Sequence, residues 1–264
     1  AEGSLFLALP REFDFNLSVT QRGGIFGAWV MFNLTSRLPV LQFTFKGDLV
    51  THSSNTLFYI HDPMCSWCWG FRPVWQKLKS QFTHTLDIVY VVGGLAPDSD
   101  QPMPLAMQNN LSNTWQHIQQ HIPGIEFNYE FWNPASNSVP RRSTYPACRA
   151  VLAAKVQDAN IEDAMILGIQ RAYYLNAKNP SDVDVLSEIA NSIGLNVEKF
   201  KQDINSPAIE LLLKEQLQLA RQLSSQGFPS LVISKDNKLF GIPLDYNNSA
   251  TMQQAIINVI NVAK

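Results

Sequence analysis

Two cysteines stand close together where the regular part of the chain begins, and their spacing is typical of redox chemistry. Cys65 and Cys68 are separated by two residues, follow a β-rich run over 56–60, and open a stretch of helical periodicity over 66–82. The N-terminus of a helix has unpaired N–H groups and a partial positive charge, so it favours a thiolate placed there. Because Cys68 lies one turn beyond Cys65, it can attack a mixed disulfide formed at Cys65. The pair therefore predicts thiol–disulfide exchange.

Three other interpretations of this pair stay open at this point. A zinc site wants four ligands, commonly two Cys-x-x-Cys pairs, whereas the sequence offers one pair with Cys148 and His61 as further candidates. Haem attachment needs a histidine after the second cysteine, and Trp69 stands there instead. A purely structural pair is the third interpretation. Three cysteines are too few for a disulfide scaffold, so redox exchange is the hypothesis carried forward.

Several residues beside the pair are candidates for a role in the sulfur chemistry. A protonated His61 would favour the thiolate; alternatively, His61 ends the strand and is hydrogen-bonded. Asp62 is expected to cap the following turn or helix, and its negative charge would oppose thiol ionisation slightly. Trp67, between the cysteines, is a candidate apolar contact for substrate, whereas Trp69 and Trp75 are expected to pack in the core.

Residues further along the chain have both a structural and a functional interpretation. Cys148 lies in an Ala-rich run, where a buried inert thiol is expected and a third redox thiol is the alternative. Arg141 and Arg142 form a solvated pair or receive a carboxylate such as that of glutathione. Pro229 precedes a β-run, and the first position of a strand tolerates proline. Tyr173 is expected to line the helical core.

The periodicity of the sequence predicts the elements that position these residues. Strands are expected over 56–60 and 86–92 with the 66–82 helix between them, which implies a parallel pair with a right-handed crossover. Residues 103–226 have an almost entirely helical pattern. A β-hairpin over 230–241 and a last helix over about 248–262 follow.

Residues 1–55 differ from the rest and are predicted to be an N-terminal extension of unclear role. Their apolar run over 24–32 is too short to span a bilayer and does not fit a secretory signal. No run of about 18 apolar residues occurs elsewhere, so no membrane-spanning helix is expected. The formal net charge of −2 argues against a basic coat for nucleic acid.

The order of these motifs resembles the DsbA-like thioredoxin-fold family, in particular cytosolic-type members described as protein-disulfide isomerases. The resemblance covers about residues 56–264 and rests on the segments 62–70, 146–150 and 227–231. It implies an α/β thioredoxin fold with a large helical insertion between the βαβ unit and the C-terminal β-hairpin plus helix. The expected thioredoxin-like domain comprises 56–96 and 227–264, and the inserted helical domain comprises 97–226.

The resemblance also implies roles for individual residues. Cys65 would be the nucleophile and Cys68 the resolving thiol, and Pro229 would be a cis-proline facing them. The backbone of Phe228 would pair with a bound peptide or thiol substrate. The best-known periplasmic members have Pro-His between the cysteines, whereas this chain has Ser66-Trp67, which puts a strongly oxidising potential in doubt.

The expected function is therefore that of a thiol–disulfide oxidoreductase of the protein-disulfide isomerase or reductase type. It would need no metal and no bound organic cofactor, and glutathione or a protein dithiol would serve as redox partner. We expect a cytoplasmic protein acting on thiol or disulfide proteins or low-molecular-weight thiols, with its oligomeric state open. One alternative is a glutathione-dependent isomerase or transferase of the hydroxychromene-carboxylate isomerase or kappa-class type. The other is a non-enzymatic binding or adaptor protein.

Overall fold

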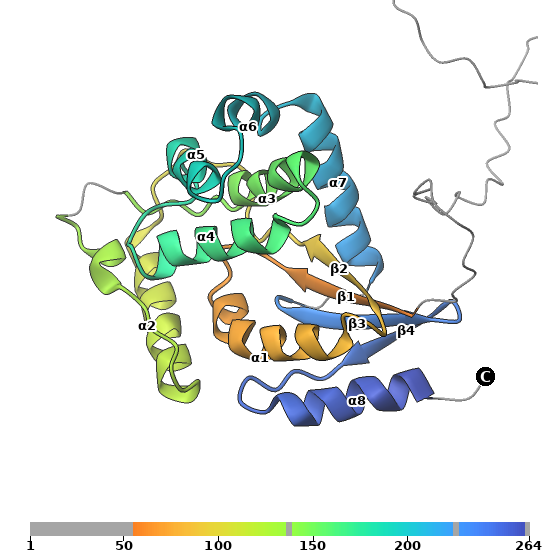
Figure 1. The fold of residues 1–264 in the computed structure, drawn as a ribbon. Coiled ribbons are helices and arrows are strands. Elements are labelled where there is room, and N and C mark those ends of the chain that lie inside the picture. The colour runs from red at the N-terminus through yellow and green to blue at the C-terminus, as the bar shows by residue number, and fades with distance from the viewer. Residues whose placement is uncertain (1–54, 136–138, 224–226, 262–264) are drawn as a thin grey trace, which may run out of the picture. The chain divides into compact units, whose positions relative to one another are not determined.

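Four short strands form one mixed sheet in the computed structural model, which describes residues 55–135, 139–223 and 227–261 (Figure 1). The strands are β1 (Thr56–His61), β2 (Asp87–Val92), β3 (Ser230–Lys235) and β4 (Lys238–Ile242), in the order β2-β1-β3-β4. β1 runs parallel to β2 and antiparallel to β3, and β3 is antiparallel to β4. The parallel pair and the hairpin predicted from the sequence are thereby confirmed. The extension predicted over residues 1–55 lies outside the described residues except for its last residue.

Alternate side chains of β1 face two different helical layers. Leu57 and Tyr59 join the larger core with α1 (Ser66–Phe82) and α8 (Ser249–Asn261), whereas Ile60 joins a smaller cluster with α7 (Pro207–Gln222). This alternation is the period of two that a strand with both faces covered requires. Helices α1 and α8 therefore lie on one face of the sheet and α7 on the other (Figure 1).

Between β2 and β3 the chain is mostly helical and packs beside the sheet. This region contains α2 (Leu105–His121), the 3-10 helix η1 (Tyr129–Trp132), α3 (Tyr145–Gln157), α4 (Glu162–Tyr174), α5 (Val183–Ser192), α6 (Val197–Asp203) and α7. Helix α7 packs on the sheet as well as on α3. The division at 96/97 and 226/227 stays a prediction.

The predicted elements and the observed ones differ mainly between α2 and α3. Helix α1 has the predicted bounds, and β1 is one residue longer than the expected 56–60 run. The expectation of an almost entirely helical segment is wrong for 122–144, where η1 is the one helix among the described residues. Pro123 and Gly124, with φ of +78° at Gly124, end the preceding helix there. In the described part of the chain, no helix is long and apolar enough to cross a membrane.

Candidate active site

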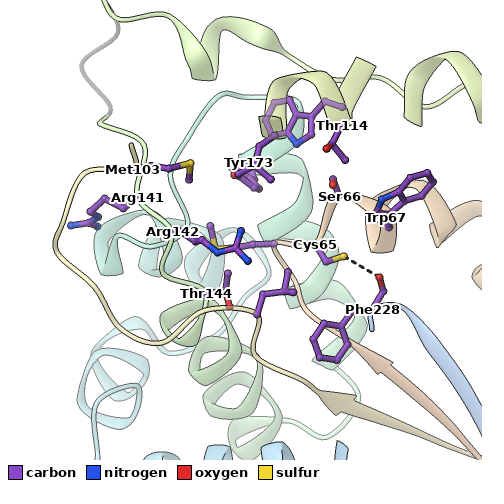
Figure 2. A pocket seen from close by; sticks show the side chains of 14 residues that line it. Cys65, Ser66, Trp67, Met103, Thr114, Arg141, Arg142, Thr144, Tyr173 and Phe228 are labelled. Carbon is purple, nitrogen blue, oxygen red and sulfur yellow. Dashed lines mark hydrogen bonds between the residues drawn. The ribbon is translucent and has the colours of Figure 1, made fainter. Parts of the chain in front are cut away.

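Cys65 begins helix α1 and presents its thiol at the end of the sheet. It is the N-cap residue, with extended backbone angles (φ −82°, ψ 119°), and its carbonyl accepts the N–H of Trp69 at 3.1 Å. Its own N–H donates to the Asp62 carbonyl at 3.0 Å, which closes the turn between β1 and α1. Cys65 is 7% exposed, and its Sγ donates to the Phe228 carbonyl oxygen at 3.4 Å (Figure 2). The thiol thus lies at the N-terminus of α1, the positive end of the helix dipole.

Cys68 lies one turn further along α1 and is fully buried. Burial raises the pKa of the Cys68 thiol, and the neighbouring Cys65 side chain raises it further. All three cysteines, including Cys148, are free thiols in this structure. Cys65 is thus slightly exposed and Cys68 is not exposed at all, which is the order of access expected of a nucleophile and its resolving cysteine.

The segment before β3 closes the site opposite Cys65. The Phe228–Pro229 peptide bond is cis, as the resemblance implied, and the Phe228 carbonyl faces the Cys65 thiol. The Phe228 ring lies over Gly93, where an added Cβ would come within 2.0 Å of it. Gly93 is therefore required for this close approach. The sequence around Gly93 gives no signal for this contact, because Phe228 lies far along the chain.

Asp62 is the polar centre beneath the turn and is completely buried. Its Oδ1 accepts the N–H of Met64 at 2.8 Å, and its Oδ2 accepts the N–H of Leu95 at 2.7 Å and the hydroxyl of Thr144 at 2.6 Å. Burial raises the pKa of Asp62, and these hydrogen bonds partly offset that rise. The expected capping of the turn is present. The bonds to Leu95 and Thr144, distant in sequence, were missed because spacing gives no signal for them.

His61 ends β1 as expected, but its ring does not act as the sequence suggested. Its ring is fully buried, stacks on Tyr59 at 5.1 Å and meets Tyr90 edge-on at 5.8 Å. Neither ring nitrogen has a hydrogen-bond partner in the described part of the chain, so the expected hydrogen bond is absent there. Burial, and next the positive charge of Arg72, lower the pKa of His61 to about 3. A neutral imidazole supplies no charge to favour a thiolate, so the suggested modulation by protonated His61 is wrong.

A cavity of about 260 Å³ opens beside Cys65, and its lining includes other residues singled out from the sequence, Phe228 and Tyr173 among them (Figure 2). Trp67 forms part of its wall and is half-buried, in edge contact with His117 of α2 and Tyr246. Arg141 and Arg142 also line it, although Arg141 is paired with Asp182. The structure therefore brings together the cysteine pair, Trp67, Phe228 and the two arginines.

The remaining candidates fall outside the cavity. Trp75 is in the core, 1% exposed, with its indole N–H on the Tyr90 hydroxyl, whereas Trp69 is half-buried and stacks on Tyr174. Cys148 is fully buried, 3.8 Å from Asp62 Oδ2, and burial raises the pKa of its thiol. Among the described residues, no group of three or more His, Cys, Asp or Glu side chains is arranged to hold a metal ion.

Solved structures of other proteins have the same fold. A protein of Nitrosomonas europaea superposes with a TM-score of 0.70, is 24% identical, and the match covers 80% of this chain and 100% of that one. The cytosolic disulfide reductase DsbM from Pseudomonas aeruginosa gives a TM-score of 0.63 at 24% identity, with 79% of this chain and 100% of that one covered. These likenesses show a DsbA-like thioredoxin fold.

Curated relatives have a different kind of name. The ClpXP adapter protein SpxH of Bacillus subtilis strain 168 is 27% identical over 177 residues, which are 66% of this chain and 56% of that protein. The chain thus spans a little over half the length of the curated relatives it matches. A family model described as thioredoxin matches residues 58–252, well over half of the chain. This chain belongs to that thioredoxin family.

Proposed function

We propose that the chain is a thiol–disulfide oxidoreductase in which Cys65 is the attacking group and Cys68 the resolving group. The observation that carries this proposal is the position of the Cys65 thiol at the N-terminus of α1, beside a cavity and 3.4 Å from the Phe228 carbonyl. The fully buried Cys68 lies behind it. The proposed exchange uses these two thiols and needs no metal or organic cofactor.

The proposed reaction conserves electrons in two displacement steps. The Cys65 thiolate attacks one sulfur of a substrate disulfide, forms a mixed disulfide, and releases the other half as a thiolate. Cys68 loses its proton and attacks the Cys65 sulfur, which releases the second half and leaves the Cys65–Cys68 disulfide. The substrate gains two electrons, and a protein dithiol or two molecules of a thiol such as glutathione return the pair to the reduced state. Net reduction or isomerisation suits a reducing compartment such as the cytoplasm.

The Phe228 carbonyl has a second part in this proposal. In the resting dithiol it accepts the Cys65 thiol hydrogen bond. When the thiolate attacks, that hydrogen is gone, and the carbonyl becomes free to accept an N–H group of an extended substrate. Pro229 has no backbone N–H, so it offers no donor that could compete with the substrate for this carbonyl.

Trapping the mixed disulfide tests the assignment of roles. With a disulfide substrate, the Cys68→Ser variant should accumulate an adduct at Cys65, because its resolving thiol is missing. Cys65→Ser should form no adduct, since the buried Cys68 cannot be reached. Cys148→Ser is the matched control, in which a third buried thiol is removed and turnover should persist. Intact-mass measurement reads all three, and an adduct on Cys65→Ser would contradict the assignment.

A second candidate function is that of an adaptor, and the names of the curated relatives favour it. An adaptor would present a bound protein to a protease and would not need the cysteines for that. Degradation of a candidate protein by purified ClpXP, with and without this chain, separates the two functions. Stimulation retained by the Cys65→Ser/Cys68→Ser double variant supports the adaptor; stimulation lost with both thiols ties any such role to the redox site.

A further inference from the structure

The cavity beside Cys65 carries positive charge that the protein itself does not neutralise. Two arginines line it, and none of its lining residues is acidic. Arg141 is paired with Asp182 and extends away from Cys65 in Figure 2. Arg142 is exposed and takes part in no hydrogen bond or ion pair within the described part of the chain. In Figure 2 its side chain extends toward the side of the cavity where Cys65 lies.

Two hydroxyl groups at the same cavity also lack protein partners. Tyr173 is 5% exposed and Ser66 is 9% exposed, and both line the cavity. Neither hydroxyl has a hydrogen-bond partner among the residues that the structure describes. Neither hydroxyl oxygen is among the buried unpaired atoms of the described residues, so both are open to the cavity, where they can hydrogen-bond a polar ligand.

We propose that this cavity is a binding site for a low-molecular-weight thiol or disulfide that carries a carboxylate. Its sulfur lies at Cys65 and its carboxylate at the Arg142 guanidinium, with the Tyr173 and Ser66 hydroxyls as further hydrogen-bond donors. This inference rests on the proposed function and specifies its substrate class. Arg142 is a specificity residue, because it touches a part of the substrate that does not react.

The size and walls of the cavity favour a small molecule over a protein segment. A volume of about 260 Å³ is just below the range of about 300–1,000 Å³ for ligand pockets. Trp67 of α1 and Trp115 of α2 form part of its wall, with the aromatic area that holds the uncharged part of a ligand. Cys65, at 7% exposed, is reached through this space.

The test measures the rate of adduct formation at Cys65 with two disulfides that differ in charge. The Cys68→Ser protein is mixed with glutathione disulfide, which carries carboxylates, or with hydroxyethyl disulfide, which carries none, and the adduct is followed by intact mass. The same measurements are repeated on Cys68→Ser protein that also carries Arg142→Gln. Cys68→Ser protein that also carries Arg221→Gln is the control. Arg221 is an exposed arginine on α7 and does not line the cavity.

We expect Arg142→Gln to slow the reaction with glutathione disulfide about tenfold, because a charge-assisted contact of about 1.4 kcal/mol corresponds to that factor. The reaction with hydroxyethyl disulfide should change less than about twofold, and Arg221→Gln should change neither reaction. Added salt should reduce the preference for the charged disulfide.

Other outcomes overturn the proposal in distinguishable ways. An equal loss with both disulfides, or no effect of Arg142→Gln on glutathione disulfide, overturns the carboxylate site and leaves the proposed function standing. A neutral cysteine-peptide disulfide that reacts faster than glutathione disulfide in all variants assigns the cavity to peptide substrates instead. No adduct with any disulfide overturns the proposed function and this inference together.

Discussion

Replacing Asp62 with alanine removes the hydrogen-bond acceptor on which the turn before Cys65 depends. The carboxylate is completely buried and joins three segments: the turn itself through Met64, the end of β2 through Leu95, and the start of α3 through Thr144. The change leaves the N–H groups of Met64 and Leu95 without their acceptor. The Thr144 hydroxyl keeps an alternative in the Ala96 carbonyl, 3.4 Å away.

The expected loss in the free energy of unfolding follows from these contacts. A buried N–H group without an acceptor lowers the free energy of unfolding by about 1–3 kcal/mol, and two such groups are affected here. Part of that loss is offset, because the variant no longer buries a carboxylate whose pKa burial has raised. We therefore expect Asp62→Ala to lower the free energy of unfolding by about 3 kcal/mol at neutral pH.

Asp158→Ala is a matched control for this measurement. Asp158 also accepts the N–H of the residue two positions on, Asn160, at 2.9 Å, but it lies in an exposed turn. Its replacement should cost no more than about 0.5 kcal/mol, as is usual for surface positions. Urea unfolding of both variants against the unaltered chain gives the comparison. If Asp62→Ala loses no more than Asp158→Ala, the buried carboxylate does not organise the turn.

The pH dependence of stability provides an independent check on Asp62. Because burial raises its pKa in the folded state, the folded chain binds more protons at this residue than the unfolded chain, whose Asp pKa is about 3.9. Between that value and the raised folded pKa, the contribution of Asp62 to stability falls as the pH rises. Asp62→Asn should remove this slope; an unchanged slope would contradict the direction of the shift.

Two further predictions concern residues beside the site. His61→Phe should make the folded state more resistant to acid. Because the pKa of the imidazole is lowered to about 3 in the folded chain, the unfolded chain takes up a proton below pH 6.5 that the folded chain does not. Removing the imidazole should therefore raise the free energy of unfolding at the lowest pH by up to about 5 kcal/mol. Equal acid unfolding of both proteins would refute this. Gly93→Ala should displace the Phe228 ring and destabilise the chain by about 1–3 kcal/mol, as overpacking does, and Gly241→Ala, where nothing lies within 4 Å of an added Cβ, should lack the steric part. Thermal unfolding compares the two variants. A smaller loss of stability for Gly93→Ala than for Gly241→Ala would show that the Phe228 ring moves aside without cost.

Local patterns were sufficient to predict the elements that carry the cysteines. The apolar spacing of residues 66–82 gave the bounds of α1, and the polar turn before Lys238 gave the hairpin, where Asp236 and Asn237 both have positive φ. The Cys65–Cys68 spacing gave the candidate nucleophile and resolving group, and the resemblance supplied the cis bond at Pro229.

Contacts between distant segments were beyond such patterns. Nothing near Asp62 in sequence indicates that Thr144 and Leu95 donate to it, because the fold alone brings them together. The protonation state of His61 follows from complete burial among aromatic rings, which the spacing to Cys65 does not reveal. Likewise, Arg141 is paired and Arg142 is not because Asp182, about forty residues further along the chain, lies beside Arg141.

The redox equilibrium of the Cys65–Cys68 pair tests the central claim most directly. The protein is equilibrated in graded glutathione buffers, trapped by alkylation, and read by mass. We predict a reversible two-electron transition that Cys65→Ser abolishes and Cys148→Ser preserves, with a midpoint nearer the thioredoxin value of about −270 mV than the DsbA value of about −120 mV. If both thiols are alkylated in every buffer, the pair does not exchange electrons, and the oxidoreductase account is contradicted.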